Sequence, residues 1–298
     1  MQNAPVQRSR AVLVTGCSSG IGEATAARLA SAGWTVYATA RRTETLAGLA
    51  QRGCRILALD VTDEASMAAA VAAVEQEEGA VGVLVNNAGY SQSGAVESVS
   101  MDDVRRQFET NVFGLVRMCQ LVLPGMRAQR WGRIVNVSSM GGRLTFPGGG
   151  LYHGSKHAVE AISDALRYEV AGFGVHVVVV EPGIIRSRFG ETAVGAIGGI
   201  ATADGPYAAF NHAVAQATVN AYERGPLGRL GGSPDAVARR IEAIVRSPAP
   251  HARYRVTASA RVMLALRRLL PDAAWDAMLR NTFPRPGTES PPDASVGA

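Results

Sequence analysis

The chain has 298 residues, 47% of them hydrophobic, so it can bury one large core. It has no run of 18 apolar residues and no apolar leader, so we expect neither a membrane span nor secretion. Its three cysteines are odd in number and lack metal-ligand spacing, which argues against a disulfide framework or zinc site and fits a reducing cytoplasm. The net charge of +5 is concentrated in residues 223–285, with twelve arginines against five acidic residues, but no nucleic-acid-binding motif accompanies them, and we expect no nucleic-acid partner.

Short apolar runs alternate with alanine-rich helical stretches along the chain. Several runs are apolar throughout, which is typical of strands covered on both faces of a parallel sheet. We therefore predict the α/β class: a Rossmann-type, doubly wound parallel sheet of about seven strands with helices on both faces. The predicted strands are 11–15, 35–39, 55–59, 81–85, 133–137, 176–180 and a seventh near 254–257. The predicted helices are 21–32, 43–51, 63–77, 102–129 and 152–173.

We predict one dinucleotide-binding and catalytic domain over residues 1–280. Residues 184–224 read as an insertion, because a glycine-rich stretch there gives way to a helical run at 207–222. Such a segment could order around an apolar ligand, although a plain surface loop fits equally well. Residues 281–298 have the composition of a disordered tail.

The first predicted strand runs directly into the glycine-rich segment TGCSSGIG and then into a helix. In this position glycines let the backbone approach a pyrophosphate, whose charge is favoured by the amides and dipole at the helix start. The strand-turn-helix context strengthens what would be weak evidence from glycines alone. The predicted dinucleotide contacts here are Gly16, Ser18, Ser19, Gly20, Ile21 and Gly22.

The end of the second predicted strand carries Arg41 and Arg42, where an NAD-specific site would place an acidic residue for the ribose hydroxyls. A guanidinium can bind a 2′-phosphate by charge and by a bidentate fork. We therefore predict NADP(H) as the cofactor, in preference to NAD(H). The alternative is that both arginines simply face solvent.

Polar and small residues also follow the third and fourth predicted strands. Ligands of open α/β sheets bind at the carboxyl ends of the strands, so residues there are placed to touch a dinucleotide. Turn formation alone could explain either group. The predicted contacts are Asp60, Val61, Asn87, Ala88 and Gly89.

Lys156 is the only lysine in the chain, and it follows Tyr152 by four residues on a predicted helix. This spacing puts both side chains on one helix face. A nearby ammonium stabilises a phenolate, so we expect Lys156, together with an oxidised nicotinamide, to lower the pKa of Tyr152 toward working pH. Tyr152 could then act as a general acid or base. A stray surface lysine is the competing interpretation.

Taken together, the segments TGCSSGIG, NNAG, TNVFG, IVNVSS, YHGSK and EPG resemble the short-chain dehydrogenase/reductase family in its single-domain branch. Their order and spacing match over about residues 10–257. GWTVYATARR and the end of the chain are also similar to members grouped with hydroxysteroid and retinol dehydrogenases. The resemblance implies an oxidoreductase that interconverts a ketone or aldehyde and an alcohol.

The resemblance also implies roles for single residues. Tyr152 would be the proton donor or acceptor, Lys156 its partner, Ser139 the hydroxyl that orients the carbonyl, and Asn111 the holder of a proton-relay water. The cofactor would contact Tyr152, Lys156, Pro182, Gly183, Ile185 and Ser187. It further implies a homodimer or homotetramer, formed through the long helices before and after the fifth strand.

Several alternatives compete with this interpretation. His153 and His157 have i, i+4 spacing but no HExxH glutamate, so we expect no metal site. The apolar stripe around residues 262–270, beside arginines, could touch a membrane, although core packing is the preferred interpretation. A non-catalytic dinucleotide sensor or scaffold on the same fold is the alternative function, which the complete set of implied catalytic residues disfavours. Residues near 90–93, 143–151 and 185–222 should line the substrate pocket, and their mostly apolar and small side chains predict a small hydrophobic carbonyl or alcohol substrate.

Overall fold

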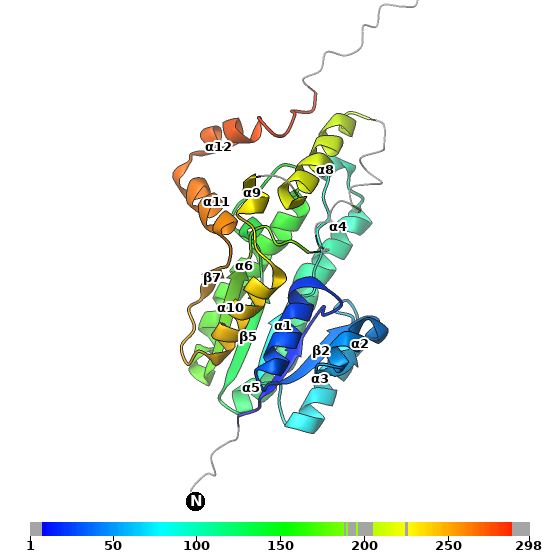
Figure 1. Cartoon of the computed structure of the whole chain (residues 1–298), viewed down its shortest axis with the longest axis vertical. Helices are drawn as coiled ribbons and strands as arrows, with labels where there is room; N and C mark the ends of the chain where they lie inside the picture. Colours follow the sequence, from blue (N-terminus) through cyan, green and yellow to red (C-terminus); the bar gives the residue numbers. More distant parts are fainter. Residues whose placement is uncertain (1–7, 188, 190–194, 196–204, 224–225, 288–298) are drawn as a thin grey trace, which may run out of the picture.

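The computed structural model describes residues 8–187, 189, 195, 205–223 and 226–287. Within these residues seven parallel strands form one sheet, ordered β3-β2-β1-β4-β5-β6-β7. Helices surround the sheet (Figure 1), which confirms the predicted fold class. The strands are β1 Ala11–Val14, β2 Thr35–Ala40, β3 Arg55–Ala58, β4 Val83–Asn86, β5 Gly132–Val137, β6 Val175–Glu181 and β7 Arg253–Arg255.

The strand order runs outward in two directions from the β1–β4 pair. The carboxyl ends of these neighbouring strands therefore diverge into loops that leave a crevice, which is where ligands of doubly wound sheets bind. The α-helices are α1 Gly20–Ser31, α2 Ala47–Ala50, α3 Glu64–Glu78, α4 Met101–Phe108, α5 Gly114–Ala128, α6 Gly150–Val170, α8 Ala208–Glu223, α9 Pro226–Arg229, α10 Pro234–Arg246, α11 Ala258–Leu269 and α12 Asp272–Leu279.

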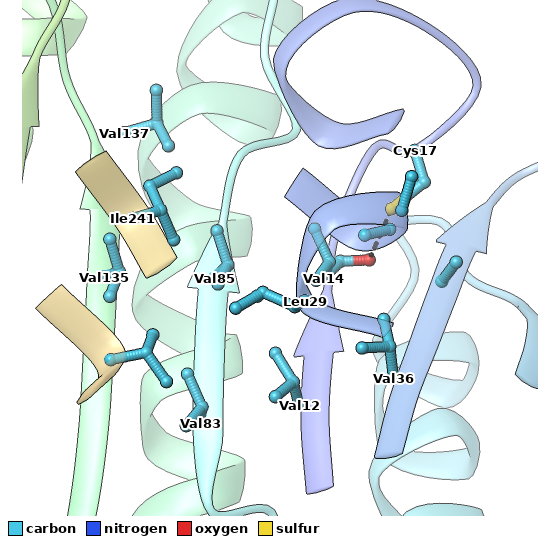
Figure 2. Packing of buried hydrophobic residues seen from close by; sticks show 14 of the residues in the cluster. Val12, Val14, Cys17, Leu29, Val36, Val83, Val85, Val135, Val137 and Ile241 are labelled. Atoms are coloured by element: carbon cyan, nitrogen blue, oxygen red, sulfur yellow. Dashed lines mark hydrogen bonds between the residues drawn. The ribbon is translucent and has the colours of Figure 1, made fainter. Parts of the chain in front are cut away.

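Two hydrophobic cores cover the two faces of the sheet. Val12 and Val14 pack with Leu29 of α1 and Ile241 of α10, as Figure 2 shows. Leu13, between them in β1, joins the other core with residues of α3, α5 and α6. This alternation requires apolar residues at every position of β1, because successive side chains point to opposite faces. The all-apolar strands in the sequence therefore reflect burial on both faces.

The observed elements differ from the prediction at specific places. The predicted helix 102–129 consists of α4, a π-helical turn, η3 Glu109–Phe113, and α5. The predicted helix 43–51 begins as the 3₁₀ turn η1 Thr43–Leu46 before α2. The last strand ends at Arg255 instead of Thr257, because Thr257 is the N-cap of α11 and accepts a hydrogen bond from the backbone N–H of Ala260.

Helix α10 is an element that the sequence analysis did not anticipate. Ser233 caps it, Pro234 stands in its first turn, and the buried Val237 and Ile241 face α1 and the sheet. Ion pairs from Arg28 of α1 to two acidic residues of α10 reinforce the contact. Helices α1 and α10 thus cover one face of the sheet side by side, as Figure 1 shows.

Two predictions extend beyond the described residues. The predicted insertion 184–224 is described at 184–187, 189, 195 and 205–223, and the predicted tail 281–298 is described only to residue 287. The remaining parts of both segments lie outside the described residues. None of the described helices has the length and apolar character needed to cross a membrane.

Candidate active site

The loop between β1 and α1 has the backbone that its glycines predict. Gly16 and Gly20 have φ values of 72° and 65°, a region that side-chain-bearing residues rarely adopt. A Cβ at Gly22 would collide with the carbonyl oxygen of Gly16. The loop therefore leaves its backbone uncovered by side chains just before the N-terminus of α1, which suits it to bind the pyrophosphate of a dinucleotide.

Thr15 and Asn87 fasten this loop to the end of β4. The Thr15 hydroxyl accepts hydrogen bonds from the backbone N–H groups of Asn87 and Ala88, each at 3.0 Å. The Asn87 side chain donates to the carbonyl oxygens of Thr15 and Gly16, each at 2.9 Å. The structure thus brings the glycine loop and the predicted Asn87-Ala88-Gly89 segment together at the switch point of the sheet. Thr15 stands in the quoted motif but was not among the predicted site residues.

The predicted contacts after β2 and β3 have different environments. Arg41 and Arg42 are exposed, and the nearest acid to Arg42 is Glu44 at 3.8 Å. Asp60 uses one carboxylate oxygen to accept hydrogen bonds from the backbone and hydroxyl of Thr62, at 2.9 and 2.8 Å. Val61 is buried beside Gly114 of α5. Arg41 and Arg42 have donors available to a ligand, whereas Asp60 is engaged in its own turn.

The segment after β6 returns to the glycine loop. The Pro182 carbonyl accepts a hydrogen bond from the Met140 N–H at 2.8 Å, and the Gly183 N–H donates to the Thr257 hydroxyl at 3.1 Å. Ile185 forms an isolated bridge with Gly232. Ser187 lies opposite Gly20, with its Cβ 3.5 Å from where a Gly20 Cβ would stand. Of the four predicted residues in this segment, Ser187 lies at the glycine loop, whereas Ile185 is buried in the core.

Lys156 is buried on α6, one turn after Tyr152. Its Nζ donates to the Val137 carbonyl at 2.9 Å and lies 5.9 Å from the centre of the Tyr152 ring. Burial lowers the pKa of Lys156 to about 8, and the charge of Glu160 partly opposes this shift. The β5 strand end thus holds the ammonium in one position, which excludes the interpretation of a stray surface lysine.

Tyr152 and Ser139 lie next to each other at the end of β5. Burial raises the pKa of Tyr152 to about 12, against the lowering effect of a hydrogen bond with Ser139. The Ser139 oxygen also accepts a hydrogen bond from the Gly141 N–H at 3.0 Å. The expectation that Lys156 lowers the Tyr152 pKa is not met in the protein alone, because the ammonium points to the Val137 carbonyl and burial dominates.

Asn111 occupies the π-helical turn between α4 and α5. Its amide nitrogen donates to the Tyr90 carbonyl and to the Ser155 hydroxyl, each at 3.0 Å, and its oxygen accepts from the Tyr90 N–H at 3.1 Å. The Ser155 hydroxyl donates in turn to the Tyr152 carbonyl at 2.7 Å. Asn111 is therefore joined to the Tyr152 backbone through Ser155, a residue of the YHGSK motif that the predicted site omitted.

Two aromatic residues beyond the motifs approach Tyr152. The Phe189 ring centre lies 5.7 Å from that of Tyr152. Tyr222, near the end of α8, has its pKa raised by burial and by the charge of neighbouring Tyr152. Neither was among the predicted catalytic or cofactor-binding residues, although both fall within the range 185–222 that was predicted to line the substrate pocket. The tertiary fold places these residues, 37 and 70 positions later in the chain, beside the tyrosine.

Helix α8 lies against two loops near the site. The Asn211 side-chain oxygen accepts a hydrogen bond from the Ala95 N–H at 2.8 Å, and the Tyr207 hydroxyl donates to Glu97 at 2.6 Å. Val214 packs where a Cβ of Gly148 would stand. This part of the predicted insertion thus contacts the loops that follow β4 and β5. Figure 1 shows α8 at one end of the molecule.

A metal site at His153 and His157, the competing chemical interpretation, finds no support in the geometry of the described residues. His153 is buried, accepts a hydrogen bond from the Phe146 N–H at 3.3 Å, and has its pKa lowered to about 4 by burial. Across the part of the chain that the structure describes, no three His, Cys, Asp or Glu side chains gather into a metal site. The described residues therefore offer His153 no group of companion ligands for a metal ion.

Residues 10–195 match the family model described as short chain dehydrogenase. This chain belongs to the short-chain dehydrogenase/reductase family. Among curated relatives, a 3-ketodihydrosphingosine reductase of Bacteroides thetaiotaomicron is 43% identical over 178 residues, which are 60% of this chain and 65% of that protein. The 17-beta-hydroxysteroid dehydrogenase type 1 of Mus musculus is 38% identical over 258 residues, 82% of this chain and 72% of that protein.

Solved structures of the short-chain dehydrogenase/reductase family share the fold over most of the chain. A short-chain dehydrogenase from Streptomyces avermitilis has a TM-score of 0.72 at 32% identity, covering 93% of this chain and 99% of that one. A closed serine dehydrogenase complexed with NADP+ has a TM-score of 0.71 at 28% identity, covering 83% and 94%. A family member from Burkholderia phymatum in complex with NAD has a TM-score of 0.73 at 24% identity, covering 91% and 95%, and shows the fold alone.

Proposed function

We propose that this oxidoreductase uses NADP(H) to interconvert a hydrophobic ketone or aldehyde with the corresponding alcohol, with Tyr152 as the general acid or base. The observation that carries the proposal is the grouping of Ser139, Lys156 and Asn111 around Tyr152. Ser139 hydrogen-bonds the Tyr152 side chain, the Lys156 Nζ lies 5.9 Å from the Tyr152 ring centre, and Asn111 reaches the Tyr152 carbonyl through Ser155. The glycine loop supplies a matching cradle for a dinucleotide on the other side of the crevice.

In reduction, Tyr152 would give its proton to the carbonyl oxygen of the substrate, and Ser139 would donate a hydrogen bond to the same oxygen. A bound nicotinamide supplies the hydride when the cofactor is present. Because burial raises its pKa to about 12, the phenol holds its proton and is suited to act as an acid. In oxidation, the same group must lose its proton, so the Lys156 ammonium would have to stabilise the phenolate.

Lys156 and Asn111 would act through position and charge. Lys156, held at the Val137 carbonyl, lies beside Gly89 and Asn111, and from there it would bind the ribose hydroxyls of a nicotinamide cofactor. Asn111 would fix Ser155 and the α6 backbone on which Tyr152 stands. The proposed cofactor contacts in the loops are Gly16, Ser18, Ser19, Gly20, Ile21, Gly22, Asn87, Ala88, Gly89, Pro182, Gly183, Ile185 and Ser187.

The NADP(H) preference is proposed from charge. Arg41 and Arg42 are exposed at the end of β2, where a carboxylate would repel a 2′-phosphate and a guanidinium binds it. The 28% identical serine dehydrogenase bound to NADP+ is consistent with this assignment. We propose that the 2′-phosphate contacts both arginines.

The substrate class is proposed from the apolar surroundings of Tyr152. Phe189 and Tyr222 approach its ring, and Tyr222 packs with Met140 and Leu144 in an apolar cluster. Such a lining favours a hydrophobic carbonyl compound. The names of two relatives, a 3-ketodihydrosphingosine reductase and a 17-beta-hydroxysteroid dehydrogenase, support long-chain and steroid ketones as the first compounds to test.

We further propose a single catalytic domain that forms a homodimer or homotetramer in the cytoplasm. Phe113 at the start of α5 and Tyr168 on α6 are 57% and 85% exposed, which supports an interface through these two helices. All three cysteines are buried and unpaired, as expected for a reducing compartment.

The test is NADPH oxidation by the purified protein across long-chain, steroid, retinoid and aryl carbonyl compounds. Wild-type protein is compared with Tyr152→Phe and with Tyr254→Phe, a matched control on β7 that lies outside the proposed site and interface. The proposal predicts turnover in wild-type and Tyr254→Phe protein and loss of turnover in Tyr152→Phe. Retained turnover in Tyr152→Phe overturns the assigned mechanism, and NADPH binding without turnover on any compound favours a dinucleotide sensor.

A further inference from the structure

The outer edge of the sheet holds a basic recess that is separate from the candidate active site. Its volume is about 420 Å³, and we call it the arginine recess. Strand β7 forms the edge, since it pairs only with β6. The residues lining the arginine recess are Arg240, Arg253, Tyr254, Arg255 and Arg261, none of which the proposed reaction uses.

Two of the four arginines are engaged with buried carboxylates. Arg253 contacts Glu160 at 2.9 Å and Asp164 at 2.5 Å, both on α6. Glu181, whose side chain is 1% exposed, lies 3.5 Å from Arg253 and 3.4 Å from Arg255. These pairs fix the floor of the arginine recess by joining β6, β7 and α6.

The other two arginines have no carboxylate partner among the described residues. Arg240 of α10 stacks over the Tyr254 ring, with 5.5 Å between its Cζ and the ring centre, and Arg261 of α11 is exposed. Neither forms an ion pair within the described part of the chain. Two guanidinium groups therefore present their donors to the same recess from different helices.

We propose that the arginine recess binds a phosphate-type dianion, carried either by a small phosphorylated molecule or by a lipid headgroup. Two unpaired guanidinium groups match the charge of a phosphate dianion, and their planar forks match its oxygen geometry. The recess volume lies within the range of small-molecule sites. Arg255, which shares Glu181 with Arg253, adds a third donor group at the edge.

A different role would explain the same arginines without a ligand. Charged side chains on an edge strand prevent it from pairing with the edge of another sheet. That role requires charge on β7 itself, which Arg253 and Arg255 provide. It does not require Arg240 and Arg261, which reach the recess from α10 and α11. Substitution of these two arginines therefore separates the two explanations.

The experiment is isothermal titration calorimetry of the full chain with inorganic pyrophosphate. Wild-type protein is compared with Arg240→Gln/Arg261→Gln, a double change that leaves every buried carboxylate paired, and with Arg268→Gln, an exposed position of α11 outside the recess. We expect binding to wild-type and Arg268→Gln protein and a loss of about tenfold or more in affinity in the double variant. The glycine loop could also bind pyrophosphate, but that contribution is common to all three proteins.

Co-sedimentation with phosphatidylcholine vesicles, with and without phosphatidic acid, tests the second source of the phosphate. Sedimentation that requires both phosphatidic acid and the two arginines assigns the site to a lipid headgroup. Calorimetric binding that requires the arginines, without sedimentation, assigns it to a small phosphorylated molecule. Equal behaviour of wild-type and double-variant protein in both experiments overturns the proposal. Circular dichroism melting of the three proteins confirms that each is folded.

Discussion

The two ends of the proposed cofactor site are built differently. At the nicotinamide end, Lys156 and Asn111 are buried, and each is held by hydrogen bonds to backbone or side-chain groups. At the opposite end, Arg41 and Arg42 are exposed beside solvent. The groups proposed to act in the reaction are thus held in place by the protein itself, whereas the arginines proposed to bind the 2′-phosphate are exposed to solvent.

This difference in burial separates the residues proposed to act in the reaction from the residues proposed to select the cofactor. Burial shifts the pKa of Lys156 and Tyr152 and costs the protein solvation energy that hydrogen bonds must offset. Exposed arginines have no such cost, but an ordered 2′-phosphate contact must restrict their side chains. Substitutions at the buried end should therefore change turnover and stability, and those at the exposed end should change cofactor affinity alone.

The largest effect is expected for Lys156→Arg. Nζ occupies a buried position at the Val137 carbonyl, where a longer and planar guanidinium does not fit and cannot lose its charge. We expect turnover to fall by about 10²-fold or more. Steady-state assays with NADPH measure it, and Arg167→Lys, an exposed exchange on the same helix, is the control. Near-normal turnover in Lys156→Arg would contradict the proposed role.

The free energy of unfolding should also depend on pH, because the buried His153 follows Tyr152 on α6. Its pKa is lowered to about 4 in the folded protein, so the unfolded chain binds a proton first as the pH falls below 6.5. Stability should therefore decrease between pH 6.5 and 4, by about 3 kcal/mol. His153→Gln should lack this contribution, whereas the exposed His212→Gln should retain it. Urea denaturation at pH 7, 5 and 4 gives the comparison, and identical pH dependence in all three proteins would refute it.

A smaller effect is expected for Asn111→Ala. The change removes the acceptor of the Tyr90 N–H, while the Tyr90 carbonyl keeps its bond from Gln107 and the Ser155 hydroxyl keeps its bond to the Tyr152 carbonyl. An unsatisfied buried polar group is costly, and we expect a loss of about 2 kcal/mol in unfolding free energy together with reduced turnover. Denaturation and kinetics are measured on the same preparations, with the exposed Asn220→Ala of α8 as control. Unchanged stability would show that the hydrogen bonds at this turn do not order the site.

The smallest effect is expected at the exposed end. Arg41→Ala/Arg42→Ala should raise the KM for NADPH by about tenfold through loss of charge-assisted contacts to the 2′-phosphate. The KM for NADH and the melting temperature should not change, because neither side chain is buried. Arg52→Ala, another exposed position, is the matched control. An equal rise in KM for both cofactors would refute a role in phosphate selection.

The sequence was most informative where one local pattern determined the backbone. The all-apolar run at β1 predicted a strand with cores on both faces, and the glycines at 16, 20 and 22 predicted the tight loop. The order of the motifs also allowed the family to be recognised before the structure was known. The structure brings Tyr152, Lys156, Ser139 and Asn111 into one region, and their catalytic roles stay predictions.

Features that depend on distant residues were not predictable in this way. Helix α10 is amphipathic, but its burial depends on α1, about 210 residues earlier (Arg28 and Asp235 differ by 207 positions). The π-helical turn at Asn111 arises within a sequence that reads as one continuous helix. The Tyr152 pKa depends on burial and on where the Lys156 ammonium points, which i, i+4 spacing does not specify.

The most direct test of the separation between the two ends is a side-by-side measurement on Tyr152→Phe and Arg41→Ala/Arg42→Ala. NADPH dissociation constants come from fluorescence titration, and rates come from single-turnover reduction at saturating NADPH. We predict that Tyr152→Phe loses the rate and keeps the affinity, while the arginine variant loses affinity and keeps the rate. If Tyr152→Phe keeps the rate, or if the arginine variant loses it at saturation, the account is contradicted.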